Sequence, residues 1–567
     1  MKNVKIVFWS LLFLMVCQFS YAQDDGSSKL SGSLEANGNF FIEDTLIGAT
    51  NTPQYDHQLY GADAWLQLNY SNWGFDVGVR FDLFNNSNLL NPQGSYTDAG
   101  IGRWYISKTI HKLGITAGYI YDQIGSGIIF RAYEQRPLLI DNALFGLRLT
   151  YALTDDWKLK VFTGQQKKQF DRYPAIIKGG NVDGFFSGGE GSKWSMAPGF
   201  GVVNRTLDDG TMNTIVNTIN TYHINDSIPA KYNVYAFSLY NTLTVGRFSW
   251  YIEGAYKSEE QYFDPDAIKT INDTTFSQGK LVFNDGSVLY TSLSYANKGF
   301  GLTVEAKRTE RFKLRTDPFV TLNQGMIGFI PPMARVNTYR MTARYQPATQ
   351  ELGEWAFQGD FTYSPSRKWR FNVNVSHIRG LDNPAYDYTL ARDTALFYNE
   401  VYTEVTYKIK RKWQIIGGVQ FQQYNQDLFE VKPGKPMVNT ITPYIDVLYK
   451  FDRKKSFRLE AQYMRSDEDF GRWLFGLVEL SLAPHWTFTI SDMYNISPNV
   501  KKEEIPSDSN GDKLKLHYPR FDIFYAFKGN RFSLSYVKQV EGIVCTGGIC
   551  RLEPAFSGVK FTANSTF

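Results

Sequence analysis

The sequence predicts an all-β protein, a large antiparallel transmembrane β-barrel of about 24 strands within a range of roughly 22 to 26. Three observations predict this fold class. Runs of about ten residues alternate apolar and polar side chains, as tilted strands that cross a bilayer do. The connections between runs are alternately short and long. Aromatic side chains lie beside the short connections.

The alternation separates two faces within each run. In residues 75–83 the odd positions are apolar, whereas Asp76, Gly78, Arg80 and Asp82 share the other face. A soluble β-sandwich shows the same alternation, so this pattern alone does not decide the class of protein. In a barrel the polar face points into the lumen. The side chains expected to face the lumen are Asp76, Arg80, Asp82, Lys158, Lys160, Glu305, Lys307, Glu404, Lys408, Arg458 and Glu460.

The connections favour a membrane barrel. Short polar turns alternate with long connections at residues 85–99, 169–231, 380–396 and 497–514. Bacterial outer-membrane barrels have this asymmetry, with short periplasmic turns and long extracellular loops. A barrel of this size is too wide to be filled by its wall side chains, so it must hold water, its own loops or another chain. Residues 169–231 are long enough to fold inward as a constriction.

The aromatic side chains near the short turns predict a girdle at the membrane interface. The tryptophans assigned to this girdle are Trp73, Trp157, Trp369, Trp413 and Trp486. Amphipathic rings concentrate at the boundary between membrane and water. The aromatic core of a soluble sheet would instead be scattered along the strands.

The strand number follows from counting runs. About 23 runs are visible, whereas a barrel with both ends in the periplasm needs an even number. Short turns follow even-numbered runs up to residue 298 and odd-numbered runs from residue 364. One strand is therefore hidden between them, and we assign it to residues 318–332, "PFVTLNQGMIGFIPP".

Both termini fit an exported barrel. Residues 1–22 predict a signal peptide, with Lys2 and Lys5 before an apolar run and small residues before Gln23. Residues 23–567 then form a single outer-membrane β-barrel domain. Its first strand is expected at residues 29–41, which leaves no room for an N-terminal plug domain. The alternation at the other end continues to Phe567, so we expect this residue to close the barrel by pairing the last strand with the first.

Composition excludes several classes of protein. The chain has 60 Lys and Arg against 56 Asp and Glu, a balance that argues against nucleic-acid binding. After the signal peptide no apolar run reaches the roughly 18 to 20 residues of a membrane helix, in keeping with a mean hydropathy of -0.33. The expected partners are outer-membrane lipid and the barrel assembly machinery.

Two cysteines remain after processing, Cys545 and Cys550, on either side of a glycine-containing turn. Export to an oxidising compartment predicts a disulfide between them. A free pair and a metal site are the alternatives, but further cysteine or histidine is lacking nearby.

The chain resembles Gram-negative outer-membrane β-barrel proteins, and in particular the family known as domain of unknown function 6029. The resemblance rests on the signal peptide, some two dozen strands, "EGIVCTGGICR" and a terminal phenylalanine. The resemblance covers the mature chain and implies fold and location. It carries no functional residues across. Ligand-energised outer-membrane receptors are a poorer match, because their plug and coupling segment would precede the first strand.

The sequence predicts no catalytic, cofactor or metal site. Asp56 and His57 adjoin in a predicted loop, and Ser376 and His377 would point to opposite faces of a strand, so neither pair predicts catalysis. "DSNGDK" at residues 508–513 lacks the glutamate that a calcium loop places at its twelfth position. We therefore expect a protein that is not an enzyme.

Two functions fit these features. The first is an outer-membrane channel or transporter for a hydrophilic solute, gated by residues 169–231. The second is a non-conducting, plugged barrel that acts as a scaffold for a protein partner in a secretion or assembly complex. The apolar residues 127–146 fit inward folding or partner docking.

Overall fold

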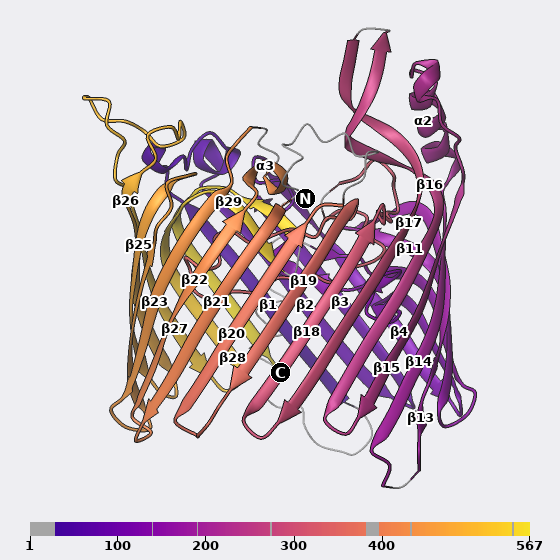
Figure 1. The fold of residues 1–567 in the computed structure, drawn as a ribbon, viewed down its shortest axis with the longest axis horizontal. Coiled ribbons are helices and arrows are strands. Elements are labelled where there is room, and N and C mark those ends of the chain that lie inside the picture. Colours follow the sequence, from indigo (N-terminus) through magenta and orange to yellow (C-terminus); the bar gives the residue numbers. More distant parts are fainter. Residues whose placement is uncertain are drawn as a thin grey trace, which may run out of the picture.

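The structure is a computed structural model, and it describes residues 29–567 except 139, 190, 273–274, 322, 382–395, 431–433 and 547–548. Within these ranges 24 antiparallel strands form one closed wall, which confirms the predicted barrel (Figure 1). The predicted signal peptide lies outside the described residues. No helix of the described part of the chain has the length and hydropathy needed to cross a membrane.

The first half of the wall consists of β1 (Lys29–Phe41), β2 (Tyr60–Asn72), β3 (Phe75–Ser87), β4 (Tyr96–Ile110), β5 (Leu113–Ile120), β10 (Leu144–Ala152), β11 (Trp157–Lys168), β12 (Asp171–Gly184), β14 (Trp194–Thr206), β15 (Asn233–Val245), β16 (Phe248–Asn272) and β17 (Thr275–Asn297). The second half consists of β18 (Phe300–Glu310), β19 (Gly353–Tyr363), β20 (Trp369–Arg379), β21 (Leu396–Ile409), β22 (Trp413–Tyr424), β23 (Val438–Lys450), β24 (Lys455–Met464), β25 (Gly471–Leu482), β26 (Trp486–Pro498), β27 (His517–Phe527), β28 (Asn530–Gln539) and β31 (Phe556–Thr566).

The last strand closes the wall. β31 pairs with β28 on one side and with β1 on the other. The seam continues to the final residue, because Gly32 N donates to Phe567 O at 2.8 Å and Phe567 N donates to Gly32 O at 3.0 Å. Pairing of the last strand with the first removes the two free edges that an open sheet would have at its ends.

Short turns lie at one end of the barrel and long connections at the other (Figure 1). Aromatic residues begin several strands directly after a short turn, including Trp157, Trp369, Trp413 and Trp486, and Trp73 lies within such a turn. Trp369 stacks on Tyr407 of the neighbouring strand with ring centroids 4.1 Å apart.

Burial alternates along the wall strands. In β23 the residues Val438, Thr440, Thr442 and Tyr444 are buried, whereas each residue between them is exposed. The exposed face is apolar along much of the wall, with Ile441 and Ile445 as examples. This outer face suits lipid, and the buried face looks onto the lumen.

Residues 318–332 are not a wall strand, so this prediction is wrong. Residues 311–352 contain no named strand within the described positions and run between β18 and β19. Short turns follow every even-numbered strand of the wall, including β19, the fourteenth, so the parity holds without a strand at 318–332. The apolar residues of this segment led to the prediction of a wall strand. In the structure Ile327 and Ile330 are buried in the cluster that fills the lumen.

Residues 169–231 are not an inward loop either. They contain two wall strands, β12 and β14, the two-residue strand β13 (Phe186–Ser187) and helix α2 (Asp209–Ile219). Helix α2 lies at the long-loop end beside the tall β16–β17 hairpin (Figure 1). Its Met212 and Ile215 pack in one apolar cluster with Leu281 of β17. The predicted gate at 169–231 is therefore contradicted.

The remaining elements are short. Connections at the long-loop end contain η2 (Thr45–Ile47), η3 (Gln54–Gln58), η5 (Ile224–Asp226) and α3 (Gln426–Phe429). The connection between β5 and β10 contains β6 (Asp122–Gln123), β7 (Arg131–Ala132), β8 (Glu134–Gln135), η4 (Arg136–Leu138) and β9 (Ile140–Asp141). Between β28 and β31 lies the hairpin of β29 (Gly542–Thr546) and β30 (Ile549–Glu553).

Candidate functional site in the lumen

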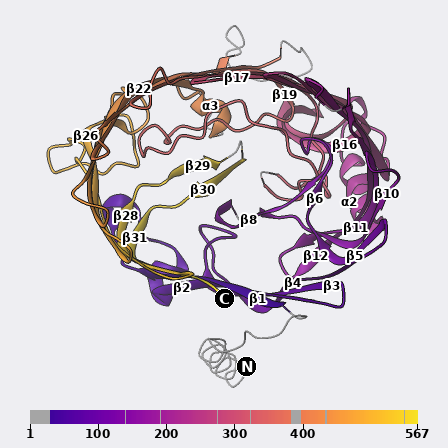
Figure 2. The same cartoon turned by 90° about the horizontal axis from the view of Figure 1, so that it is seen from below.

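Three connections from the long-loop end fold into the lumen. Seen along the barrel, β6, β8 and the β29–β30 hairpin lie inside the ring of wall strands (Figure 2). We call residues 121–143 the inner loop and residues 311–352 the strap. The inner loop overlaps the apolar stretch 127–146 for which the sequence left inward folding and partner docking open, and in the structure it folds inward.

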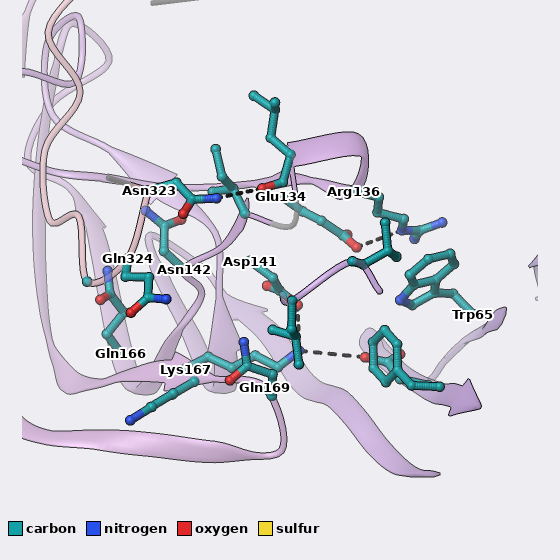
Figure 3. A pocket seen from close by; sticks show the side chains of 18 of the residues that line it. Trp65, Glu134, Arg136, Asp141, Asn142, Gln166, Lys167, Gln169, Asn323 and Gln324 are labelled. Atoms are coloured by element: carbon teal, nitrogen blue, oxygen red, sulfur yellow. Dashed lines mark hydrogen bonds and ion pairs between the residues drawn. The ribbon is translucent and has the colours of Figure 1, made fainter. Parts of the chain in front are cut away.

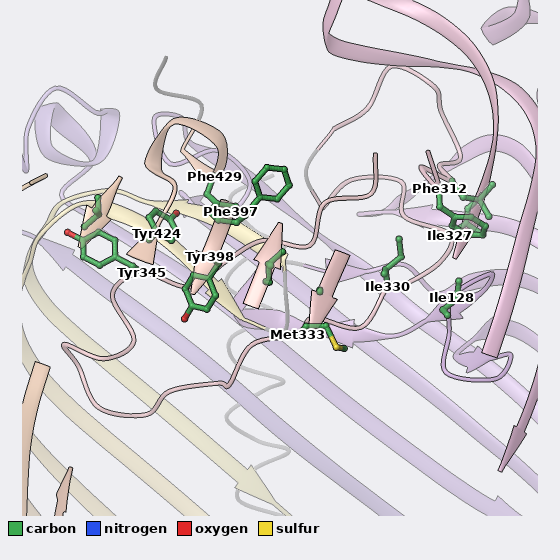
Figure 4. Packing of buried hydrophobic residues seen from close by; sticks show 14 of the residues in the cluster. Ile128, Phe312, Ile327, Ile330, Met333, Tyr345, Phe397, Tyr398, Tyr424 and Phe429 are labelled. Carbon is green, nitrogen blue, oxygen red and sulfur yellow. The ribbon is translucent and has the colours of Figure 1, made fainter. Parts of the chain in front are cut away.

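Apolar packing joins the inner loop, the strap and the wall. Ile128 of the inner loop, Ile327 and Ile330 of the strap and Tyr398 of β21 belong to one buried cluster. Figure 4 shows this cluster extending across the lumen towards Tyr424 and its neighbours. Side chains therefore fill this part of the barrel.

The inner loop and the strap meet backbone to backbone. Arg131 N donates to Ile327 O at 2.8 Å, and Phe329 N donates to Gly127 O at 2.9 Å. Between them, a Cβ atom on Gly328 would lie 2.0 Å from Ile128 O. Only glycine allows the two chains to approach this closely.

Arg80 of β3 is the main charged contact of the inner loop. Its guanidinium donates to Asp82 on its own strand at 2.6 Å and to Glu134 and Asp141 of the inner loop, both at 2.7 Å. The Arg80 side chain is only 2% exposed. One planar cation thus joins three carboxylates, a task for which the five donors of arginine are suited.

Asp141 is also held by Lys167 of β11, whose Nζ lies 2.5 Å from Asp141 Oδ2, and by the Tyr121 hydroxyl, which donates to Oδ1 at 2.7 Å. Burial alone would raise the pKa of Asp141, but the ion pairs with Lys167 and Arg80 outweigh it and lower this pKa to about 2. The carboxylate is therefore ionised at neutral pH.

The strap follows the inner wall through buried polar contacts. Lys307 of β18, which also pairs with Glu354 of β19, donates to Pro331 O of the strap at 2.6 Å. Asn337 donates to Glu400 of β21 at 2.7 Å, and Met341 N donates to Gln462 of β24 at 2.8 Å. Because these contacts reach strands far apart around the wall, the strap is fixed to the barrel along its length.

The side chains predicted to face the lumen differ in burial along the barrel. Asp76, Lys158 and Lys408, each within two residues of a strand's short-turn end, are exposed. Farther from the short turns Arg80, Asp82 and Lys307 are buried. The described lumen is thus solvated near the short turns and filled towards the long loops.

The other predicted lumen residues make polar contacts. Lys160 pairs with Asp122 of the inner loop at 2.6 Å. Glu305 accepts from the Tyr290 hydroxyl at 2.6 Å, and Glu404 accepts from the Tyr402 hydroxyl at 2.7 Å. Arg458 pairs with Asp446 at 2.9 Å and also contacts Glu460.

A cavity of about 340 Å³ lies between the inner loop, the strap and the wall. Figure 3 shows Glu134, Asp141, Lys167 and Gln169 around it, with Trp65 at one side. Sequence reasoning missed Glu134 and Asp141, because it sought lumen charges only on alternating wall strands. A signal was present: these carboxylates lie in the otherwise apolar stretch 127–146.

The cysteine hairpin has the expected register. Cys545 of β29 lies opposite Cys550 of β30. Cross-strand neighbours have Cα atoms about 4.5 to 5.5 Å apart, which a disulfide can span. The two side chains lie outside the described part of the structure, so the disulfide stays a prediction.

A closed antiparallel wall with an apolar outer face and a polar, loop-filled lumen defines a large transmembrane β-barrel. A family model matches residues 1–567, and the chain belongs to this family, the Family of unknown function (DUF6029). No curated protein matches the chain.

Several solved structures match the chain at low sequence identity. The P pilus usher (PapC) translocation pore is 8% identical with a TM-score of 0.45, over 95% of this chain and 99% of that one. The unliganded ferric citrate transporter FecA is 8% identical with a TM-score of 0.43, over 96% and 79%. Pseudomonas aeruginosa OccK5 (OpdH) is 9% identical with a TM-score of 0.32, over 82% and 96%.

Proposed function

We propose that the protein is a gated channel of the outer membrane for a hydrophilic solute, described here with its outer half closed. The observation that carries this proposal is the change in burial along the lumen. Near the short turns, polar wall side chains such as Lys158 and Lys408 are exposed. Near the long loops, the inner loop and the strap cover the polar side chains of the wall that face the lumen. The proposal involves no catalytic step.

The inner loop is the better candidate for the moving gate. Its carboxylates Glu134 and Asp141 are about one-fifth exposed, so water can solvate them when they leave Arg80. The strap is instead held to the rest of the barrel by Asn337, which donates to Glu400, and by Arg344, which pairs with Asp469, and both carboxylates are buried. Moving the strap would leave more charge unpaired in a dry environment.

A disulfide lock tests this gate. A Cβ atom on Gly201 of β14 would lie 2.3 Å from Cγ2 of Ile124 in the inner loop. Cysteines at the two positions would have Cβ atoms within about 4 Å, as a disulfide requires. We expect the oxidised Ile124→Cys/Gly201→Cys variant to lose the channel openings of the wild type in a planar bilayer. Reduction should restore them, and each single variant serves as a control.

The second candidate is a plugged scaffold for a secretion or assembly complex. The many strap contacts around the wall favour it, because they hold the filling of the lumen in one place. A wild-type barrel that folds correctly but never conducts would support the scaffold and contradict the channel.

A further inference from the structure

The wall is interrupted beside β4. β4 pairs with β3 from Lys108 to Tyr96, but it pairs with β5 only from Ile110 to Tyr105. At this point Gly118 of β5 has a φ of +102°, and a Cβ on it would lie 2.5 Å from Trp104 O. Glycine here lets the chain turn away from β4 and lead into the inner loop.

No strand replaces β5 above this point among the described residues. β10 returns to the wall at Leu144 and pairs with β5 and β11, not with β4. Residues 96–104 of β4 therefore have a strand neighbour on one side only. At about 3.3 Å per residue and a tilt of about 45°, this edge begins roughly 14 Å above the periplasmic end, inside an apolar band about 25 Å tall.

Phe170, in the turn between β11 and β12, covers the gap. A Cβ on Gly100 of β4 would lie 3.4 Å from the Phe170 ring, and the Phe170 and Phe84 rings are 6.0 Å apart. The pairing of β3 with β4 also shifts register beside Gly102, as a β-bulge does. Side chains, instead of a hydrogen-bonded ladder, thus close the wall here: Phe170 lies beside Gly100, and the Phe145 ring of β10 lies 5.7 Å from that of Trp104.

The 340 Å³ cavity lies behind this closure. Phe84 and Leu90 line one part of it, and Lys168 and Gln169 line another. Lys168 Nζ lies 5.3 Å from the centre of the Tyr173 ring. Within the described ranges no carboxylate pairs with this amine, whereas the neighbouring Lys167 is paired with Asp141. The cavity therefore offers an apolar wall and a cation without a counter-ion.

We propose that this cavity binds the apolar chain of an anionic amphiphile, which enters from the outer leaflet between β4 and the 169–170 turn. The anionic head group, a carboxylate or a phosphate, pairs with Lys168 at the outer end of β11. The chain lies against Phe84 and Leu90, where it replaces water on apolar surface. Displacement of Phe170 opens the way, since no wall hydrogen bond has to break. Because the inner loop lines one side of this cavity, the site is a property of the closed conformation, whether or not the loop moves as a gate.

Photocrosslinking tests the site. The full chain, folded into phosphatidylcholine nanodiscs, is incubated with dodecanoic acid or dodecyl phosphate, each carrying a diazirine at its chain end, and labelled residues are mapped by mass spectrometry. We expect labels on Phe84 and Leu90. Labelling by both probes indicates that a free fatty acid suffices, and labelling by the phosphate probe alone indicates a lipid head group.

Two variants separate binding from folding. Leu90→Trp should fill the cavity and abolish the labels, while Lys168→Gln should weaken binding of the anionic probes about fivefold. Lys193→Gln, in a short periplasmic turn, is the matched control and should change nothing. Heat-modifiable migration on gels verifies that each barrel is folded. Labels restricted to lipid-facing side chains such as Ile101, or cavity labels that persist in Leu90→Trp, would overturn the proposal. Equal labelling by a neutral dodecyl glycoside would overturn the role of Lys168.

Discussion

Removing Arg80 should open the channel. Arg80→Ala leaves Asp82, Glu134 and Asp141 as three carboxylates without the cation that joins them. Loss of one partner from a buried ion pair costs about 3 to 5 kcal/mol. We expect a cost at the lower end of this range, because Glu134 and Asp141 are 18% and 20% exposed and water can solvate them. About 3 kcal/mol shifts the equilibrium between closed and open states on the order of a hundredfold.

Single-channel recording in a planar bilayer measures this shift as open probability. Arg247→Ala, in a short turn outside the network, is the matched control. Adding Asp141→Asn to Arg80→Ala should cost less than the sum of the two single changes, because the second change removes one of the uncompensated charges. An Arg80→Ala barrel that folds and stays as closed as the wild type would refute the assignment of the inner loop as gate.

Four further predictions follow. Because the pKa of Asp141 is lowered to about 2, its stabilising contribution is complete above about pH 4 and is lost as the pH falls towards 2, so pepsin should cut the inner loop faster at pH 2 than at pH 4. Gly118→Ala should destabilise the barrel by about 1 to 3 kcal/mol in denaturant titrations, because alanine tolerates the positive φ poorly. Deleting Phe567 removes two seam hydrogen bonds and should lower the heat-modifiable fraction on gels. Mass spectrometry without reductant should find Cys545 joined to Cys550, with a mass lower by about two hydrogen atoms than that of the reduced chain.

The wall could be predicted from the sequence because its physical cause is local. Each strand faces lipid on one side and the lumen on the other. Apolar and polar residues therefore alternate along it, as Val79 and Arg80 do. The predicted count of about 24 strands is confirmed, although the strand that the parity of the turns assigned to residues 318–332 is not part of the wall. The ends of the hairpins were equally visible, since Trp369 and Trp413 directly follow short turns.

The filling of the lumen could not be predicted from the sequence. Where loops fill the lumen, the inner face of a strand is apolar like its lipid face, and the alternation of polar and apolar residues is lost. In β12 the lumen side carries Ala175 and Ile177, which are buried, while Ile176 on the other side is exposed. With both faces apolar the alternation disappears, and β12 was mistaken for loop. In the strap the error was the reverse, because a loop was predicted to be a strand. Its Ile327 and Ile330 resemble residues of a strand that faces lipid, but they pack inside the barrel.

The path of the strap has a consequence for assembly. It leaves the wall after β18, yet it binds Glu400 and Gln462 on strands that come later in the chain. These contacts join residues far apart in sequence, which slows folding. The strap cannot settle until the strands that hold it are in place. The plug of this barrel is therefore assembled late, since it needs β21 and β24 in position before its own contacts can form.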